Sequence, residues 1–567
     1  MLRPGALRVR LLPATAAFGR PWSFWLGCAT NQPNEETDPM THRKTFRLAL
    51  LAGAALLALG SAHAATLRWA GANDILTVDP HAQNHQTTHA FLQQVYESLV
   101  RYDDKFQIEP ALATKWEQIS PTQVRFTLRR GVKFHDGAPF TADDVVFSLT
   151  RAMTPPSNMQ SATQSVKEVK KVDDHTVDLI LKGPNPILLR EITEARIMNK
   201  AWAEKNNSVK SQDYGGKEEN YASRNANGTG PFKLVGWQPD VKVQLTKNPD
   251  WWDKPRGNVD EVVFTPIKSA ATRTAALISG QVDFVVDPPP QDLARMKSNP
   301  DIKLIEGAEN RTIYLGLDQF RDELPGAGTP GKNPLKDKRV RQALYQAIDS
   351  AGLHRNTMRG LSVPAGAMVA PMVHGWTKQV DERASKYDVE AAKKLLADAG
   401  YPNGFALKLE CPNDRYVNDE AICQAVTAMW TRIGVKTSLS AAPMAQFVTR
   451  VMNNDVNAYL FGWGVATFDA LYTLDSLMAT KQGKTAAGVY NGGRISDPKL
   501  DGMIQQIKTE MDQPKRDALL HDALKLTKDE YYYLPLHHQI RPWAMRKGVD
   551  TVHRADDRPM PIWTTIK

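Results

Sequence analysis

The sequence predicts an α/β protein in which a partly parallel sheet is joined to a smaller α+β region, and two observations predict it. From about residue 339 to 464, segments with helical periodicity alternate with short apolar strands, which is typical of a partly parallel sheet. Between 110 and 226, strand signals and an amphipathic helix are separated by long loops. The length of 567 residues gives room for roughly two to four domains.

An export signal is predicted over residues 40–64. The basic run "HRKTFR" is followed by the apolar run "LALLAGAALLALG" and by "AHA", the small-residue pattern that a signal peptidase accepts. The apolar run is shorter than the ~20 residues needed to span a bilayer. We therefore expect cleavage near Ala64 and a periplasmic protein that does not itself span the membrane. Residues 1–39 precede this signal, and we treat 1–64 as a leader.

Three histidines lie near the start of the first predicted helix, "AFLQQVYESLV". His81, His85 and His89 are spaced four residues apart, so on a helix they would share one face, and such a face could bind a transition metal. The segment follows Pro80 and is rich in Asn, Gln and Thr, which favours a polar loop that enters the helix. Both interpretations remain open.

The region 110–226 contains clear local signals. "TQVRFTL" alternates apolar and polar residues, as in a half-buried strand. The following helix begins at Thr141 and carries Asp144 three residues on, which predicts a capping box. Asp173-Asp174 predicts the turn of a hairpin. Beyond this region, strands return, with a helix that stops at Gly280.

The strand "NAYLFGW" ends the alternating α/β section at Gly462-Trp463-Gly464. Ligands of parallel sheets bind beyond the carboxyl ends of strands. We therefore predict that these three residues line a ligand, because an indole can stack on it and glycines allow close approach of the backbone. Packing of Trp463 in the core is the alternative.

The loop "CPNDRYVNDEAIC" follows another predicted strand. In an oxidising compartment Cys411 and Cys423 are expected to form a disulfide, worth about 3 kcal/mol by the chain-entropy estimate. Arg415, inside this loop, could bind a carboxylate through two parallel hydrogen bonds. The alternative is a surface ion pair with Asp414 or Asp419.

Composition and motifs argue against two function classes. Residues 1–64 hold seven of the 71 Lys/Arg and three of the 62 Asp/Glu residues, so the remaining chain has a net charge of about +5, with bases and acids interspersed. Such a charge distribution does not predict nucleic-acid binding. The sequence also lacks the G-x-S-x-G, phosphate-loop and H-E-x-x-H patterns, so we expect no enzyme, no cofactor and no resident metal.

Several stretches together resemble the family 5 extracellular solute-binding proteins of ABC importers, which include dipeptide, oligopeptide, nickel and glutathione receptors. The resemblance implies a periplasmic binding protein of type II, with two lobes joined by a hinge and an extra α+β domain in the first lobe. It covers essentially the whole chain after the leader. The stretches that carry it include "LTVDPHAQNHQTTHAFLQQVYESLVRYD", "FTLRRGVKFHDGAPFTADDVVFS", "GTGPFKLVGW", "NPDWWD", "ALISGQVDFV", "RVRQALYQAID" and "AGYPNGF". The implied divisions are 65–109, 227–308 and 536–567 for lobe I, 110–226 for the extra domain and 309–535 for lobe II.

The resemblance also implies ligand-binding residues. Arg415, beside Tyr416, matches an arginine that holds the ligand carboxylate in the dipeptide receptor. The loop of Asn84, His85 and Gln86 matches one that lines the cleft. Peptide receptors place an acid three residues after the tryptophan of the wall, where it pairs with the ligand ammonium. That position is Ala466 here, and Asp469 is the acid that could substitute for it.

We expect a monomeric periplasmic receptor that captures a peptide or a peptide-like solute by closure of two lobes and delivers it to an inner-membrane ABC permease. One alternative on the same fold is a receptor for a nickel chelate or haem, which would use the face of His81, His85 and His89. An alternative of another class is a secreted hydrolase, which would need a nucleophile with a paired base.

Overall fold

The computed structural model describes residues 64–483 and 487–567. The predicted export signal falls on residues up to 63 and so lies outside the described part of the chain. Residues 64–567 form one compact unit. Among its described helices, none is long and apolar enough to pass through a bilayer.

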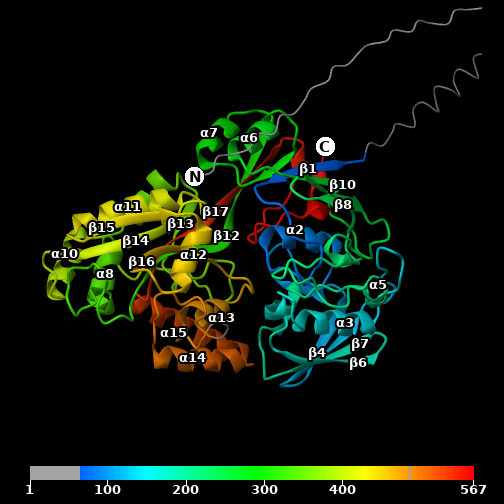
Figure 1. The fold of residues 1–567 in the computed structure, drawn as a ribbon, viewed down its shortest axis with the longest axis horizontal. Helices are drawn as coiled ribbons and strands as arrows, with labels where there is room; N and C mark the ends of the chain where they lie inside the picture. Colours follow the sequence, from blue (N-terminus) through cyan, green and yellow to red (C-terminus); the bar gives the residue numbers. More distant parts are fainter. Residues whose placement is uncertain (1–63, 484–486) are drawn as a thin grey trace, which may run out of the picture. The chain divides into compact units, whose positions relative to one another are not determined.

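One large mixed sheet of eleven strands organises the described part of the chain (Figure 1). Strands β1 and β10, and also β14 and β15, pair in parallel, whereas β12, β16 and β17 pair antiparallel. The predicted α/β class is confirmed. In spatial order the strands are β15 (Lys436–Ala442), β14 (Ala406–Pro412), β16 (Ala458–Gly464), β12 (Ile302–Leu317), β17 (Tyr533–Arg546), β11 (Phe284–Val286), β1 (Thr66–Gly71), β10 (Glu261–Pro266), β9 (Lys242–Lys247) and β8 (Phe232–Gln238), with β13 (Ser362–Pro364) also on β17.

The strands β12 and β17 carry this sheet from one lobe to the other. Residues 302–308 pair with 540–546 next to β11, and residues 312–316 pair with 533–538 next to β16. The register between the two blocks is broken at residues 309–311. The chain therefore passes between the lobes at an irregular point in both strands, where a regular ladder would resist bending.

Lobe I packs around the β1 end of the sheet. Its core contains Trp69 stacked on Phe91 of the first helix, with ring centroids 4.8 Å apart, and Phe264 of β10 against both rings. A shorter two-stranded sheet near the C-terminus completes this lobe. The other elements of lobe I are α2 (Gln86–Val95), β2 (Val100–Tyr102), β3 (Ile108–Pro110), α6 (Ala270–Ile278), α7 (Leu293–Lys297), β18 (Val549–Asp550) and β19 (Thr565–Ile566).

The α+β region of lobe I has its own four-stranded antiparallel sheet and its own apolar core. The helix α3 packs on β6 and β7 of this sheet (Figure 1). The predicted capping box is present, since the Asp144 carboxylate accepts the Thr141 amide at 2.9 Å. Its elements are β4 (Ala113–Ser120), β5 (Gln123–Leu128), α3 (Ala142–Met153), β6 (Val166–Asp173), β7 (Thr176–Leu181), α4 (Leu188–Glu191) and α5 (Lys200–Lys205).

Lobe II packs its helices around β14, β15 and β16. The helix α11 contacts β14 and β15 (Figure 1). Its Trp430 is fully buried. The predicted limits of this lobe, 309–535, fall within β12 and β17 and stay predictions. Its helices are α8 (Lys338–Gln346), α9 (Ser350–Gly352), α10 (Val389–Asp398), α11 (Asp419–Arg432), α12 (Met444–Met452), α13 (Ala470–Thr473), α14 (Pro498–Thr509) and α15 (Gln513–Asp529).

Candidate functional site

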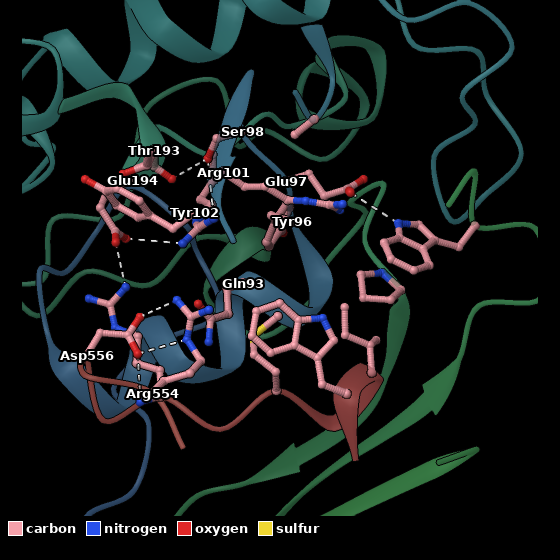
Figure 2. A pocket seen from close by; sticks show the side chains of 18 residues that line it. Gln93, Tyr96, Glu97, Ser98, Arg101, Tyr102, Thr193, Glu194, Arg554 and Asp556 are labelled. Carbon is pink, nitrogen blue, oxygen red and sulfur yellow. Dashed lines mark hydrogen bonds and ion pairs between the residues drawn. The ribbon is translucent and has the colours of Figure 1, made fainter. Parts of the chain in front are cut away.

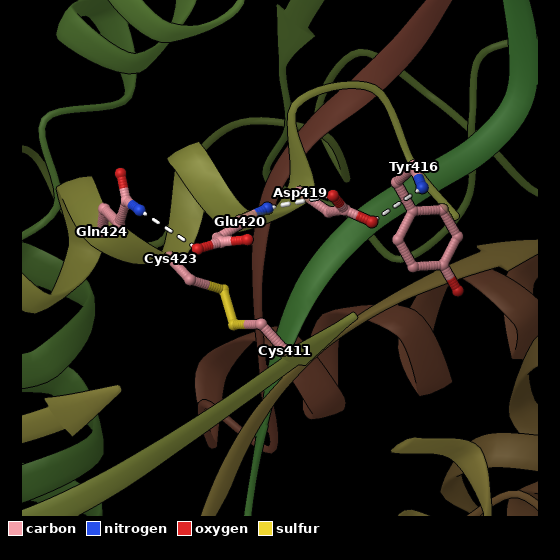
Figure 3. The surroundings of a disulfide bond; sticks show 6 residues. All are labelled: Cys411, Tyr416, Asp419, Glu420, Cys423 and Gln424. Atoms are coloured by element: carbon pink, nitrogen blue, oxygen red, sulfur yellow. Dashed lines mark hydrogen bonds between the residues drawn. A yellow bond between two sulfur atoms is a disulfide. The ribbon is translucent and has the colours of Figure 1, made fainter. Parts of the chain in front are cut away.

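Two neighbouring strands of lobe II end at the same edge of the sheet. β14 and β16 pair in parallel, so their carboxyl ends, Pro412 and Gly464, lie on one side. The loop after β14 is fastened at its base by the predicted disulfide between Cys411 and Cys423 (Figure 3). This arrangement places Arg415 beside the end of β16.

Hydrogen bonds fix the conformation of this loop. The Asp419 carboxylate accepts the backbone amide of Tyr416 at 3.0 Å (Figure 3). It also accepts the backbone amide of Arg415 at 3.0 Å. The Asp414 carboxylate accepts the amide of Met444 at 2.7 Å. Both acids therefore serve backbone groups, and neither forms the predicted alternative ion pair with the Arg415 side chain.

Tyr416 takes up the space that Gly462 leaves. Its hydroxyl donates to the Gly462 carbonyl at 3.2 Å. A Cβ at Gly462 would lie 2.6 Å from the Tyr416 ring, so only glycine fits without a shift. The close approach that the sequence predicts at Gly462 is thus made by a side chain of the protein itself. Gly464 has room for little more, because a Cβ there would lie 3.3 Å from the Arg311 guanidinium.

Arg311 and Glu309, which the sequence analysis missed, lie at the break in β12. Arg311 donates to a Glu309 oxygen at 2.8 Å, and Gln539 of β17 donates to the other oxygen at 2.6 Å. Burial opposes ionisation of Glu309, but the charges of Arg311 and Arg541 and the hydrogen bond from Arg311 together lower the pKa of that carboxyl. A signal was available, since the charged residues Glu309 and Arg311 directly precede the mostly apolar half of the strand, "TIYLGL". This ion pair lies at residues 309–311, where the chain passes between the lobes.

Arg415 is exposed, and its guanidinium lies over the Tyr416 ring, 5.4 Å from the centroid. Within residues 64–483 and 487–567 this guanidinium makes no hydrogen bond or ion pair. The positive charge of Arg311, followed by partial desolvation of the guanidinium by its neighbours, lowers the pKa of Arg415. The Arg415 side chain therefore offers five N–H donors in a locally positive field.

The predicted ligand-binding loop of lobe I consists of Asn84, His85 and Gln86. Burial, and then the positive charge of Arg415, lower the pKa of His85. Asn84 is exposed and bonds His89 at 3.0 Å, and Gln86 donates to the Asp556 carbonyl within lobe I. Of these three residues, only His85 has a pKa that the Arg415 charge affects, while Asn84 and Gln86 are engaged within their own lobe.

Trp463 is packed inside lobe II. Its ring stacks on Tyr472 with centroids 5.1 Å apart, lies 5.2 Å from the Tyr490 ring, and is 6% exposed. The alternative of core packing therefore describes Trp463, and the structure does not support its prediction as a wall that faces a ligand.

Asp469 is committed to an internal ion pair. Both of its oxygens accept hydrogen bonds from Arg516, at 2.7 and 2.9 Å, and one also accepts the amide of Leu471 at the start of α13. The carboxylate is 1% exposed. The prediction that Asp469 could replace the acid missing at Ala466 is wrong in this structure, because the carboxylate has no face left for a ligand. Ala466 itself is exposed.

The proposed face of three histidines is not formed. The helix α2 begins at Gln86, so His81 lies in the preceding loop and His85 occupies the position just before the helix, as the polar-loop interpretation predicts. His81 contacts the Arg196 carbonyl and the Arg151 guanidinium. Burial lowers the pKa of His81 to about 4. In the described part of the chain, no three His, Cys, Asp or Glu side chains are grouped as a metal site.

A cavity of about 70 Å³ lies within lobe I, apart from Arg415 (Figure 2). Glu97 lines it and accepts the indole N–H of Trp252 at 2.9 Å and the Thr229 hydroxyl at 2.8 Å. Burial raises the pKa of Glu97 in spite of these hydrogen bonds. Figure 2 shows Arg554 and Asp556 paired at another side of the cavity, 2.7 Å apart. The charged groups that line this cavity therefore already have partners within lobe I.

Proteins of known sequence and structure resemble this chain over most of its length. The model of the bacterial extracellular solute-binding proteins, family 5 Middle, matches residues 107–485. The heme-binding protein A of Haemophilus influenzae is 29% identical over 488 residues, which cover 80% of this chain and 83% of that protein. The dipeptide-binding protein of Escherichia coli is 28% identical over 472 residues, with 78% and 83% covered. The structure of HbpA2 from Haemophilus parasuis has a TM-score of 0.75 at 26% identity and covers 88% of this chain and 100% of that one.

Proposed function

We propose a function on the premise that this chain belongs to the bacterial extracellular solute-binding proteins, family 5. Such proteins bind solutes rather than transform them. The protein is the periplasmic receptor of an ABC importer. It binds a short peptide-like solute through a free carboxylate, encloses it between the two lobes and presents it to a membrane permease.

The observation that carries this proposal is the Arg415 guanidinium, which has no hydrogen-bond or ion-pair partner among residues 64–483 and 487–567. An arginine guanidinium can bind a carboxylate through two parallel, charge-assisted hydrogen bonds. The two acids near Arg415 in sequence, Asp414 and Asp419, accept hydrogen bonds from backbone amides instead. A carboxylate on the ligand would supply the missing partner and relieve the repulsion between Arg415 and Arg311.

The ligand needs no ammonium group near Ala466. An alkyl side chain stands there, and Asp469 is used by Arg516. A buried ammonium without a counter-charge loses several kcal/mol of solvation. This favours a solute whose amine is absent, blocked or placed elsewhere.

Contacts from both lobes would couple binding to closure. Arg415 belongs to lobe II and His85 to lobe I, and the charge of Arg415 contributes to the lowered pKa of His85. A ligand that touches both lobes binds the closed form more tightly than the open form, and this difference shifts the population toward closure.

The names of the relatives support recognition of a carboxylate more strongly than they support any one ligand. The names of the two relatives above state heme and a dipeptide, and both molecules carry free carboxylates. A metal-chelate receptor built on the three histidines has no support in the geometry, since His81 and His89 are bonded inside lobe I.

The experiment is to purify the protein from its native periplasm, denature it and identify the released small molecules by mass spectrometry. We expect a solute with a free carboxylate, and we expect it to raise the melting temperature when it is added back. The matched control is the same molecule with that carboxylate converted to an amide, which should have little effect. A released ligand that lacks a carboxylate, or equal stabilisation by the amide, would contradict the proposal.

A further inference from the structure

Two phenylalanines from different lobes meet face to face. Phe106 lies in the loop between β2 and β3 of lobe I, and Phe468 lies in the loop after β16 of lobe II. Their ring centroids are 4.1 Å apart, with an angle of 18° between the planes. Tyr102 lies 5.3 Å from the Phe468 ring and donates its hydroxyl to the Thr467 carbonyl at 2.9 Å.

These rings pack on each other and on Tyr102 and Met372 rather than in the main core of either lobe. The Arg554 guanidinium lies over Phe106, 4.8 Å from its ring centroid. Phe106 and Phe468 are 4% and 3% exposed. With Ala555 they form a small apolar cluster of their own, separate from the main cores of the two lobes. If the lobes separated here, each ring would lose the burial that the other lobe supplies, which is unfavourable in water.

Both phenylalanines have a backbone conformation that such residues rarely adopt. The φ angle is +58° at Phe106 and +50° at Phe468. Each residue ends a short turn, closed by hydrogen bonds from Phe106 to Asp103 and from Phe468 to Val465. A bulky residue at positive φ is strained, and such strain persists where the surroundings enforce it and is concentrated at functional sites. The same costly geometry on both sides of one contact indicates that the loops are shaped to present the rings.

The contact is also tied to the crossing between the lobes. Asn310, in the broken part of β12, donates its side-chain amide to the Val465 carbonyl and its backbone amide to the Ala555 carbonyl, each at 2.9 Å. The loop of Phe468 therefore starts at the crossing strand and reaches outward to lobe I.

We propose that Tyr102 and Phe106 of lobe I, with Thr467 and Phe468 of lobe II, form an aromatic clasp that stabilises the closed arrangement of the lobes through contacts of the protein itself. This inference rests on the lobe closure proposed above. The clasp sets how much of the closing free energy the ligand must supply. Its strength thereby tunes the apparent affinity for any ligand that binds the closed form.

The test removes the rings and keeps the loops. In Phe106→Gly and Phe468→Gly, glycine adopts the positive φ without strain. Loss of one buried aromatic pair should raise the ratio of open to closed protein about tenfold. We expect small-angle X-ray scattering of ligand-free protein to give a larger radius of gyration for each variant than for wild type. The double variant should resemble the single ones, because both rings belong to one contact.

Tyr387→Ala is the matched control, since Tyr387 is an exposed aromatic residue of lobe II. It should leave the radius of gyration unchanged. Circular dichroism of each variant establishes that the fold is kept, and Tyr102→Phe offers a milder change that removes only the hydrogen bond. An unchanged radius of gyration in both glycine variants would overturn the clasp. The scattering needs no ligand, so its outcome is independent of the ligand identified by mass spectrometry.

Discussion

Arg415 and Arg516 belong to the same lobe and have opposite surroundings. Arg516 is 2% exposed, and its guanidinium binds both oxygens of Asp469. Arg415 is exposed at the end of β14, and no carboxylate in the described part of the chain meets its guanidinium.

The difference separates two uses of one side chain. A buried arginine whose charge is fully matched cannot be freed without leaving a carboxylate uncompensated, so it holds the loop after β16 in place. An exposed arginine with no partner adds little to folding and keeps its donors for another molecule. We therefore expect changes at Arg516 to lower stability and changes at Arg415 to lower affinity.

The largest expected effect is on stability at the buried pair. Arg516→Ala leaves Asp469 buried without its counter-charge and should lower the free energy of unfolding by about 3–5 kcal/mol. Urea denaturation measures this. The neighbouring exposed Lys515→Ala is the control and should change the free energy by less than about 0.5 kcal/mol. Equal small effects for both variants would remove the distinction between the two arginines.

A smaller loss is expected where Tyr416 meets β16. Gly462→Ala places a methyl group 2.6 Å from the Tyr416 ring and should cost about 1–3 kcal/mol through overpacking. Gly502→Ala is the control, because Gly502 lies in α14 with no atom near its missing Cβ. That change should stabilise the protein by about 0.5–1 kcal/mol. If Gly462→Ala behaved like Gly502→Ala, the contact with Tyr416 would be refuted.

The smallest effect concerns the protonation of His85. Burial and the Arg415 charge lower its folded-state pKa, so Arg415→Ala should raise that pKa toward the ordinary value of about 6.5. Below pH 6.5 the unfolded chain takes up this proton more readily than the folded chain, so His85 costs stability as the pH falls. That cost should shrink in the variant. NMR titration of the His85 ring tests this directly, and an unchanged pKa would show that the two groups are not close.

Local patterns in the sequence were enough to predict much of the fold. The Thr141–Asp144 capping box and the hairpin of β6 and β7 depend on neighbours in the chain, and both are present. The disulfide could be predicted because only two cysteines follow the leader. The position of Arg415 at a strand end likewise follows from the strand that precedes it.

The residues that sequence analysis misplaced depend on distant partners. Asp469 is bound by Arg516, 47 residues away, and Trp463 is covered by Tyr490 from a later loop. Gly462 has no side chain because Tyr416, from another strand end, needs the space. No local sequence pattern indicates these distant partners. From the sequence alone, a strand end that packs inside the protein therefore could not be distinguished from one that contacts a ligand.

Isothermal titration calorimetry of Arg415→Ala with the released ligand tests the central claim most directly. Loss of the carboxylate's partner should weaken binding by about 2–5 kcal/mol, while urea denaturation shows stability within about 0.5 kcal/mol of wild type. Arg415→Lys should recover only part of the affinity, because lysine lacks the fork. Arg432→Ala, an exposed arginine on α11, should bind normally. Unchanged affinity in Arg415→Ala, or a loss that Arg432→Ala shares, would contradict the account.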